Sequence, residues 1–93
     1  MNTDDAKAIA VDALTFLAAY AARLGRFFDL SGLSPVSIRA AAREAGFLIG
    51  VLDYVDADEG LLKLFADTTG IHPSVVAKAR AALGGRTWEA DVP

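Results

Sequence analysis

An internal repeat is the feature that most constrains what this chain can fold into. When the sequence is shifted by 38 positions, residues 13–46 align with residues 51–84 without a gap. The aligned pairs that match in character include Leu14 with Leu52, Phe16 with Tyr54, Leu17 with Val55, Leu24 with Leu62, and Phe27 with Phe65. A period of this length is typical of a repeated helical supersecondary unit. We therefore expect two similar three-helix units, at about residues 8–45 and 46–83.

Both copies contain the same turn, in which glycine is followed by an aliphatic residue, one further residue and proline. Glycine adopts the left-handed conformation that ends a helix at little cost. The residue before proline is then the N-cap of the next helix, and proline fills the first helical position, where its missing N–H costs nothing. The structural turn residues predicted in this way are Gly32, Ser34 and Pro35 in the first copy and Gly70, His72 and Pro73 in the second.

The hydrophobic spacing around these turns predicts helices and no strands. The expected helices cover residues 4–19, 22–31, 35–44, 46–55, 56–69 and 73–83. The fifth is expected to begin at a capping box formed by Asp56 and Glu59. The fourth is apolar nearly all round, which favours a place in the core, the alternative being that a second subunit covers part of it. The predicted fold class is all-α, a compact six-helix bundle in one domain, with an irregular tail at residues 84–93.

Composition excludes several classes of protein. The chain has no cysteine, which excludes disulfide scaffolds, thiol catalysis and cysteine-based metal sites. A net charge of −3 and a pI of about 4.9 imply no general attraction to nucleic acid or to an anionic membrane. Much of the 54% hydrophobic content is alanine, a strong helix former, and no apolar stretch is long enough to span a bilayer. The acidic N-terminus lacks the basic region of a signal peptide, so we expect a cytoplasmic protein without a membrane partner.

The sequence offers few residues for catalysis or metal binding. His72 is the only histidine, and a lone histidine in a turn is a weak metal candidate. The acidic residues Asp53, Asp56, Asp58 and Glu59 could supply oxygen ligands, but they lack the spacing of a calcium loop, and capping explains the last three. No serine lies in a nucleophile-elbow motif. We expect no enzymatic activity, no catalytic or metal-binding residue and no cofactor.

The repeated turn supports an alternative function, nucleic-acid binding through residues 65–80. A helix-turn-helix reader needs a small residue, a glycine four positions later and a branched aliphatic residue six positions after that, and Ala66, Gly70 and Val76 have this spacing. The candidate nucleic-acid contacts are Arg39 and Arg43 in the first copy and Ser74, Lys78 and Arg80 in the second. The better-matching copy, residues 46–83, carries more acidic than basic side chains, so phosphate binding is not favoured.

The tail at residues 84–93 contains the only tryptophan, Trp88. A large indole gains by burial, so the tail is expected to dock against the helices, and the alternative is that Trp88 contacts a partner.

A resemblance to a known family runs through most of the chain. The ordered segments that carry it include Ala13-Leu14-Thr15-Phe16-Leu17, Leu24-Gly25-Arg26-Phe27-Phe28, Gly32-Leu33-Ser34-Pro35, Val51-Leu52-Asp53-Tyr54, Asp58-Glu59-Gly60-Leu61-Leu62 and Gly70-Ile71-His72-Pro73. Together they resemble a family of small bacterial proteins catalogued only as a domain of unknown function. The resemblance implies an all-helical protein and no established activity, cofactor or catalytic residue. One departure is the absence of a polar or proline-containing break at residues 20–23, which leaves the end of the first helix open.

These observations predict a non-catalytic helical interaction or adaptor module that binds a protein partner or forms a homodimer. Nucleic-acid binding is the second hypothesis, and an enzyme is the third.

Overall fold

The described part of the chain is built from five α-helices and one π-helical turn. The structure, a computed structural model, describes residues 1–31 and 44–85. The elements are α1 (Thr3–Ala18), α2 (Ala21–Ser31), α4 (Ala45–Ala57), α5 (Glu59–Thr69), α6 (Pro73–Arg80) and the π-helical turn η1 (Ala81–Gly85). The described residues contain no strand, so the all-α prediction is confirmed. Several predictions fall outside the described residues: the expected helix at 35–44 up to residue 43, the first-copy turn residues Gly32, Ser34 and Pro35, and the residues Arg39, Arg43 and Trp88. Glu44, the last residue of that expected helix, is the extended N-cap of α4.

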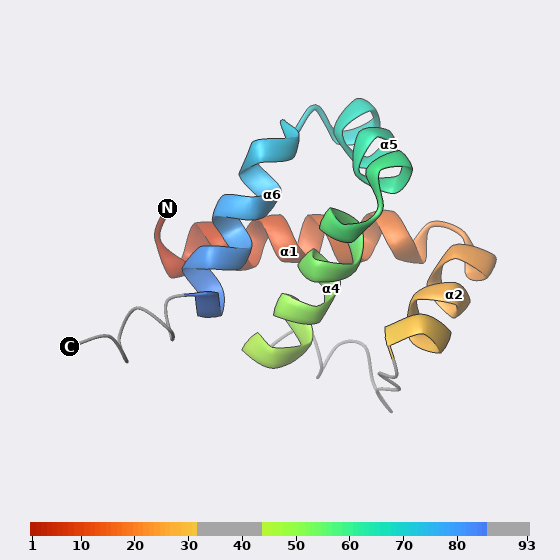
Figure 1. Ribbon diagram of the computed structural model, residues 1–93, viewed down its shortest axis with the longest axis horizontal. Coiled ribbons are helices and arrows are strands. Elements are labelled where there is room, and N and C mark those ends of the chain that lie inside the picture. Colours follow the sequence, from red (N-terminus) through yellow and green to blue (C-terminus); the bar gives the residue numbers. More distant parts are fainter. Residues whose placement is uncertain (32–43, 86–93) are drawn as a thin grey trace.

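Helix α1 runs through the middle of the fold, with α4 and α6 packed across it (Figure 1). Its contact face carries Ala6, Ala10 and Ala13, all fully buried, at a spacing that keeps them on one side of a helix. Small side chains let neighbouring helix axes approach closely, so the alanines that raise the hydrophobic content also form part of the core. Leu14 and Leu17 extend the same buried stripe toward the end of α1.

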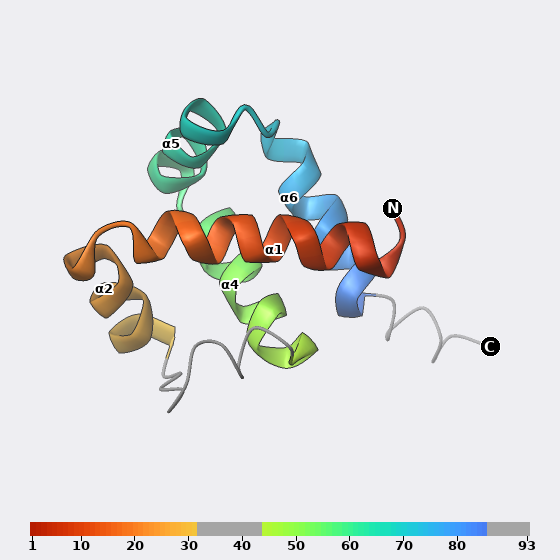
Figure 2. The same cartoon turned by 180° about the vertical axis from the view of Figure 1, so that it is seen from behind.

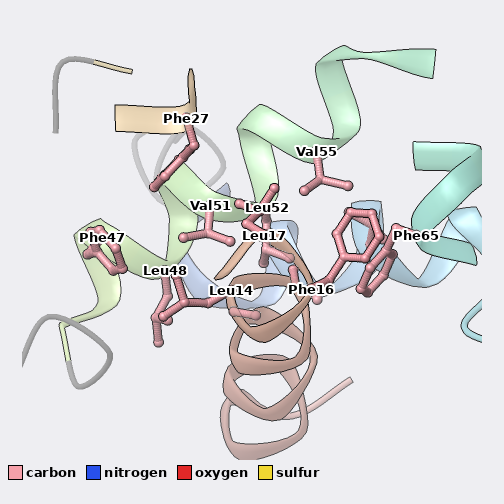
Figure 3. Close-up of a cluster of buried hydrophobic side chains, with 14 of the residues drawn as sticks. Leu14, Phe16, Leu17, Phe27, Phe47, Leu48, Val51, Leu52, Val55 and Phe65 are labelled. Atoms are coloured by element: carbon pink, nitrogen blue, oxygen red, sulfur yellow. The ribbon is translucent and has the colours of Figure 1, made fainter. Parts of the chain in front are cut away.

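The core lies between α1 and α4, and α2, α5 and α6 close it (Figure 3). Five residues of α4 are buried within the chain: Phe47, Leu48, Val51, Leu52 and Val55. Phe27 of α2 and Phe65 of α5 are fully buried, and each stabilises the fold by roughly 1.5–3 kcal/mol through the apolar surface it removes from water. The core therefore takes one large aromatic side chain from each of these two shorter helices.

These two phenylalanines pack against rings of the long helices in matching geometries. Phe65 meets Phe16 of α1 with ring centroids 5.3 Å apart and an interplanar angle of 72°. Phe27 meets Tyr54 of α4 at 5.1 Å and 69°. The 38-residue repeat relates the two pairs, because Phe16 corresponds to Tyr54 and Phe27 corresponds to Phe65. The same shift of 38 positions moves the first and last residues of α2 onto those of α5.

The first helix ends at Ala18, although the sequence at residues 20–23 could have continued it. The chain bends by 116° between α1 and α2. Nη1 of Arg23 donates a hydrogen bond of 3.3 Å to the carbonyl of Phe16, one of the last carbonyls of α1, which have no partner within the helix. Among the described residues no single helix is long and apolar enough to cross a membrane, and α1 and α2 reach that length only as a bent pair.

The expected start of the fifth helix at Asp56 is wrong. Helix α4 continues to Ala57, and the N–H of Asp58 donates back to the carbonyl of Val55. Asp58 is the N-cap of α5, and its side chain accepts a hydrogen bond of 3.1 Å from the N–H of Leu61. The two aspartates lie two positions apart, and because α4 continues past Asp56, it is Asp58 that begins α5.

The α-helical part of the last helix ends earlier than the expected 73–83. Helix α6 stops at Arg80, and the chain continues as the π-helical turn η1. There Gly84 lies so close to α4 that an ideal Cβ on it would be 2.5 Å from Cδ1 of Ile49. The missing side chain of Gly84 therefore allows a close approach of η1 to α4.

We expect Ala10→Leu to destabilise the fold by roughly 1–3 kcal/mol, because the larger side chain overfills the closely packed face of α1. Ala8→Leu is the matched control, since Ala8 is exposed on the same helix. Urea denaturation followed by circular dichroism measures both. Equal stabilities of the two variants would contradict the close packing of α1.

Asp58→Ala should cost about 1 kcal/mol of folding free energy, because it removes the side-chain cap of α5. Asp56→Ala should change the stability by less than about 0.5 kcal/mol, since Asp56 is exposed within α4. Thermal and urea denaturation of the two variants distinguish the observed cap from the one expected from the sequence. A larger loss for Asp56→Ala would reverse the assignment.

Candidate functional site

An open groove of about 620 Å³ lies on the described surface between α1, the start of α2 and the end of α5. Figure 2 shows these elements together, with α5 beside the C-terminal part of α1 near the α1–α2 corner. Residues that line this α1–α5 groove include Asp12, Phe16, Tyr20, Arg23, Leu64 and Ile71. The side chain of Phe16 is buried, whereas Tyr20 is 64% and Leu64 43% exposed. The groove thus combines a buried aromatic ring with apolar side chains that face solvent.

The cationic group of the groove is Arg23. Its guanidinium carbon lies 4.5 Å from the ring centroid of Phe16 and 4.7 Å from that of Tyr20, which is cation–π distance for both rings. With the hydrogen bond to the Phe16 carbonyl, these contacts hold the guanidinium against the wall of the groove. The guanidinium has five N–H donors and this bond uses one, so others remain available to a ligand.

A second, smaller groove of about 520 Å³ lies between α2 and the α4–α5 corner. Four of its lining residues are Arg26, Tyr54, Asp58 and Leu61. The 38-residue repeat relates each of them to a residue of the α1–α5 groove. Arg26 corresponds to Leu64, Tyr54 to Phe16, Asp58 to Tyr20 and Leu61 to Arg23. Asp58 stands where the α1–α5 groove has Tyr20, so the second groove lacks the exposed aromatic side chain.

The described basic residues expected to contact nucleic acid lie on α6, and they do not form one surface. Ser74 and Lys78 are exposed and one helical turn apart. Arg80, two positions after Lys78, lies on nearly the opposite side of the helix. There its Nε and Nη2 donate to the carboxylate of Asp53 on α4, the second bond at 3.4 Å.

Asp53 also favours the charged form of Arg80. The hydrogen bond from Arg80, together with the charge of the Asp53 carboxylate, raises the pKa of the Arg80 guanidinium above its ordinary value. Both side chains are partly exposed, so the ion pair contributes at most about 1 kcal/mol to stability. The positive charge of Arg80 is therefore already matched by a carboxylate within the chain.

The second-copy turn connects α5 and α6 at one end of the groove. Gly70 ends α5 with φ 78°, the left-handed conformation, and its N–H donates to the carbonyl of Ala66. His72 is the N-cap of α6, with Nδ1 accepting a hydrogen bond of 3.1 Å from the N–H of Ser74, and Pro73 fills the first helical position. This turn places Ile71 in the groove.

His72 and Ser74 also approach each other through their side chains, with Nδ1 of His72 2.9 Å from Oγ of Ser74. A serine beside a histidine is a geometry used in nucleophilic catalysis, which also needs a third group to orient the base. No described carboxylate bonds to His72, and both side chains are exposed outside the two grooves. The contact therefore supports the capping role.

The acidic residues considered as oxygen ligands serve structural purposes at two positions. Asp53 pairs with Arg80, and Asp58 caps α5. Within residues 1–31 and 44–85, no three histidine or carboxylate side chains come together as a set that could hold a metal ion.

Sequence reasoning missed Tyr20, Arg23 and Leu64 as surface features. Tyr20 and Arg23 lie in a stretch that could have been helical, where both would have been read as ordinary helix surface. Their proximity to Leu64 depends on the bend after α1 and on the position of α5. At these positions the sequence shows a tyrosine and, three positions later, an arginine. Many helices contain such a pair, so it does not by itself indicate a binding surface.

Comparison with known proteins places the chain in a family. It belongs to the family described as "Protein of unknown function (DUF3572)", whose sequence profile matches residues 3–86. This agrees with the resemblance seen in the ordered sequence segments. No curated protein and no solved structure matches the chain.

We expect His72→Ala to lower the stability by about 0.5–1 kcal/mol, because the N–H of Ser74 at the start of α6 loses its acceptor. His72→Asn should retain or raise the stability, since asparagine is a better N-cap than histidine. Thermal denaturation measures both variants. An asparagine variant as unstable as the alanine variant would show that capping is not the role of His72.

Proposed function

We propose that this chain is a non-catalytic protein-interaction module and that the α1–α5 groove is its binding surface. The observation that carries the proposal is the exposure of Tyr20 and Leu64 beside the buried ring of Phe16. Exposed apolar side chains that gather at a hollow, rather than lying scattered, mark sites of protein contact. The apolar groups would supply affinity, and the donors of Arg23 would select a partner group that can accept hydrogen bonds.

The scaffold of the module is, in this proposal, a six-helix bundle of two similar three-helix units. Two observations support it. Helices α2 and α5 begin and end at positions that correspond in the 38-residue repeat, and the ring contact Phe16–Phe65 corresponds to the ring contact Tyr54–Phe27. Two similar units that pack on each other across a pseudo-two-fold axis would produce this correspondence, since each unit then makes the same contact with the other.

Nucleic-acid binding remains the second hypothesis, and the described residues give it less support. A phosphate site needs basic side chains that converge, whereas Lys78 and Arg80 point to different sides of α6. Arg80 is also engaged by Asp53, which would compete with any phosphate for the guanidinium.

The proposal is tested by affinity purification of the tagged protein from its native cell, with mass spectrometry and with nuclease treatment. We expect protein partners that survive nuclease and that are lost with Leu64→Glu, because the new carboxylate interrupts the apolar rim of the groove. Leu30→Glu is the matched control, since Leu30 is 65% exposed and does not line the groove.

Partners retained equally by wild type and Leu64→Glu would show that the groove is not the binding surface. Capture that depends entirely on nucleic acid would favour the second hypothesis instead.

A further inference from the structure

We infer that the α1–α5 groove is occupied by a second copy of this chain, related to the first by a two-fold axis that passes beside Thr15 and Phe16. This inference rests on the proposed function, because it uses the same groove and identifies its partner. It is carried by the distribution of charge along the groove, which is complementary to itself.

Two opposite charges line the groove without meeting. Asp12 is exposed on α1, and the guanidinium of Arg23 is held against the rings of Phe16 and Tyr20. Among residues 1–31 and 44–85, neither forms an ion pair, although two other pairs, Lys63–Asp67 and Arg80–Asp53, do form there. Within the described residues, the charges of Asp12 and Arg23 therefore have no ionic partner.

The positions of Asp12 on α1 and of the Arg23 guanidinium, which α2 carries, suit a two-fold arrangement. Asp12, Thr15, Phe16 and Ala19 all line the groove, so the part of α1 that borders it extends over about two helical turns. A two-fold axis perpendicular to α1, between the levels of Thr15 and Phe16, places Asp12 of one copy opposite Ala19 of the other. Ala19 falls between Phe16 and Tyr20 in the sequence, and the Arg23 guanidinium lies 4.5 Å and 4.7 Å from the ring centroids of these two residues. Each Asp12 carboxylate would then face the Arg23 guanidinium of the other copy.

The two-fold arrangement gives the exposed groups of both copies a contact. In an isologous interface the same contacts form on both sides of the axis, so one dimer makes two Asp12–Arg23 pairs. It also removes Tyr20 and Leu64 of both copies from water. Thr15, next to the axis, and Ala19, one helical turn from it, have small side chains, which allows the two α1 helices to approach closely.

The experiment uses two charge-reversed variants of the purified chain, Asp12→Lys and Arg23→Glu, studied by analytical ultracentrifugation over a concentration series. We expect wild type to approach twice the monomer mass. Each variant alone should lose the dimer, because each would place like charges opposite one another at both pairs. An equimolar mixture should recover the mass of a dimer, since the reversed lysine then faces the reversed glutamate.

Asp29→Lys is the control for a change of net charge. Asp29 is exposed on α2 outside the groove, so this variant should dimerise like wild type. Circular dichroism establishes that each variant is folded.

Disulfide trapping provides a measurement that does not depend on the folding of Arg23→Glu. The chain has no cysteine, so a single introduced thiol reports one contact. Thr15→Cys, next to the axis, should form covalent dimers under mild oxidation, whereas Asp29→Cys should not.

A wild-type monomer at every concentration, or equal cross-linking of the two cysteine variants, would overturn the inference. The proposed function would survive that result if the monomer still captured another protein through Leu64. A dimer that resists both charge reversals would also overturn the inference, because its interface would lie elsewhere.

Discussion

The close contact of α1 with α4 is the constraint on which the rest of the structure depends. Fully buried alanines on α1 let the helices packed across it, α4 and α6, approach closely, and the larger side chains of α4, such as Leu48 and Val51, belong to the same core. Interiors are packed as densely as organic crystals, so a face of small residues can be matched only by a neighbour that comes close. Helices α2, α5 and α6 then pack against this central pair.

The shorter helices are held to this pair largely by aromatic rings. Phe65 brings α5 to the C-terminal part of α1, and Phe27 brings α2 to α4. Edge-to-face contacts of this kind add about 0.5–1.5 kcal/mol beyond the burial of area. Because α5 is fixed beside Phe16 and α2 departs at a sharp bend, a groove is left at the corner. The candidate site is thus a consequence of how the shorter helices are attached.

Several parts of this arrangement could be predicted from the sequence because their causes are local. Glycine before an aliphatic residue and proline predicted the turn between α5 and α6, where Gly70 has positive φ and Pro73 opens the next helix. The start of α5 could not be predicted in the same way. Asp56 and Asp58 are both suitable caps, and the choice depends on how far α4 continues along the core. The change from α6 to the π-helical turn η1, which packs against α4 near Ile49, could not be predicted either.

The sequence by itself determined that this chain is helical, that it carries a net charge of −3 and that it contains no cysteine. These properties follow from composition and from interactions within a few residues of chain. Only the tertiary structure decided that Tyr20 and Leu64, distant in sequence, share one groove and that Arg80 is paired with Asp53. The physical reason is that a surface is formed by side chains from different helices, and their proximity is set by the packing of the core beneath them.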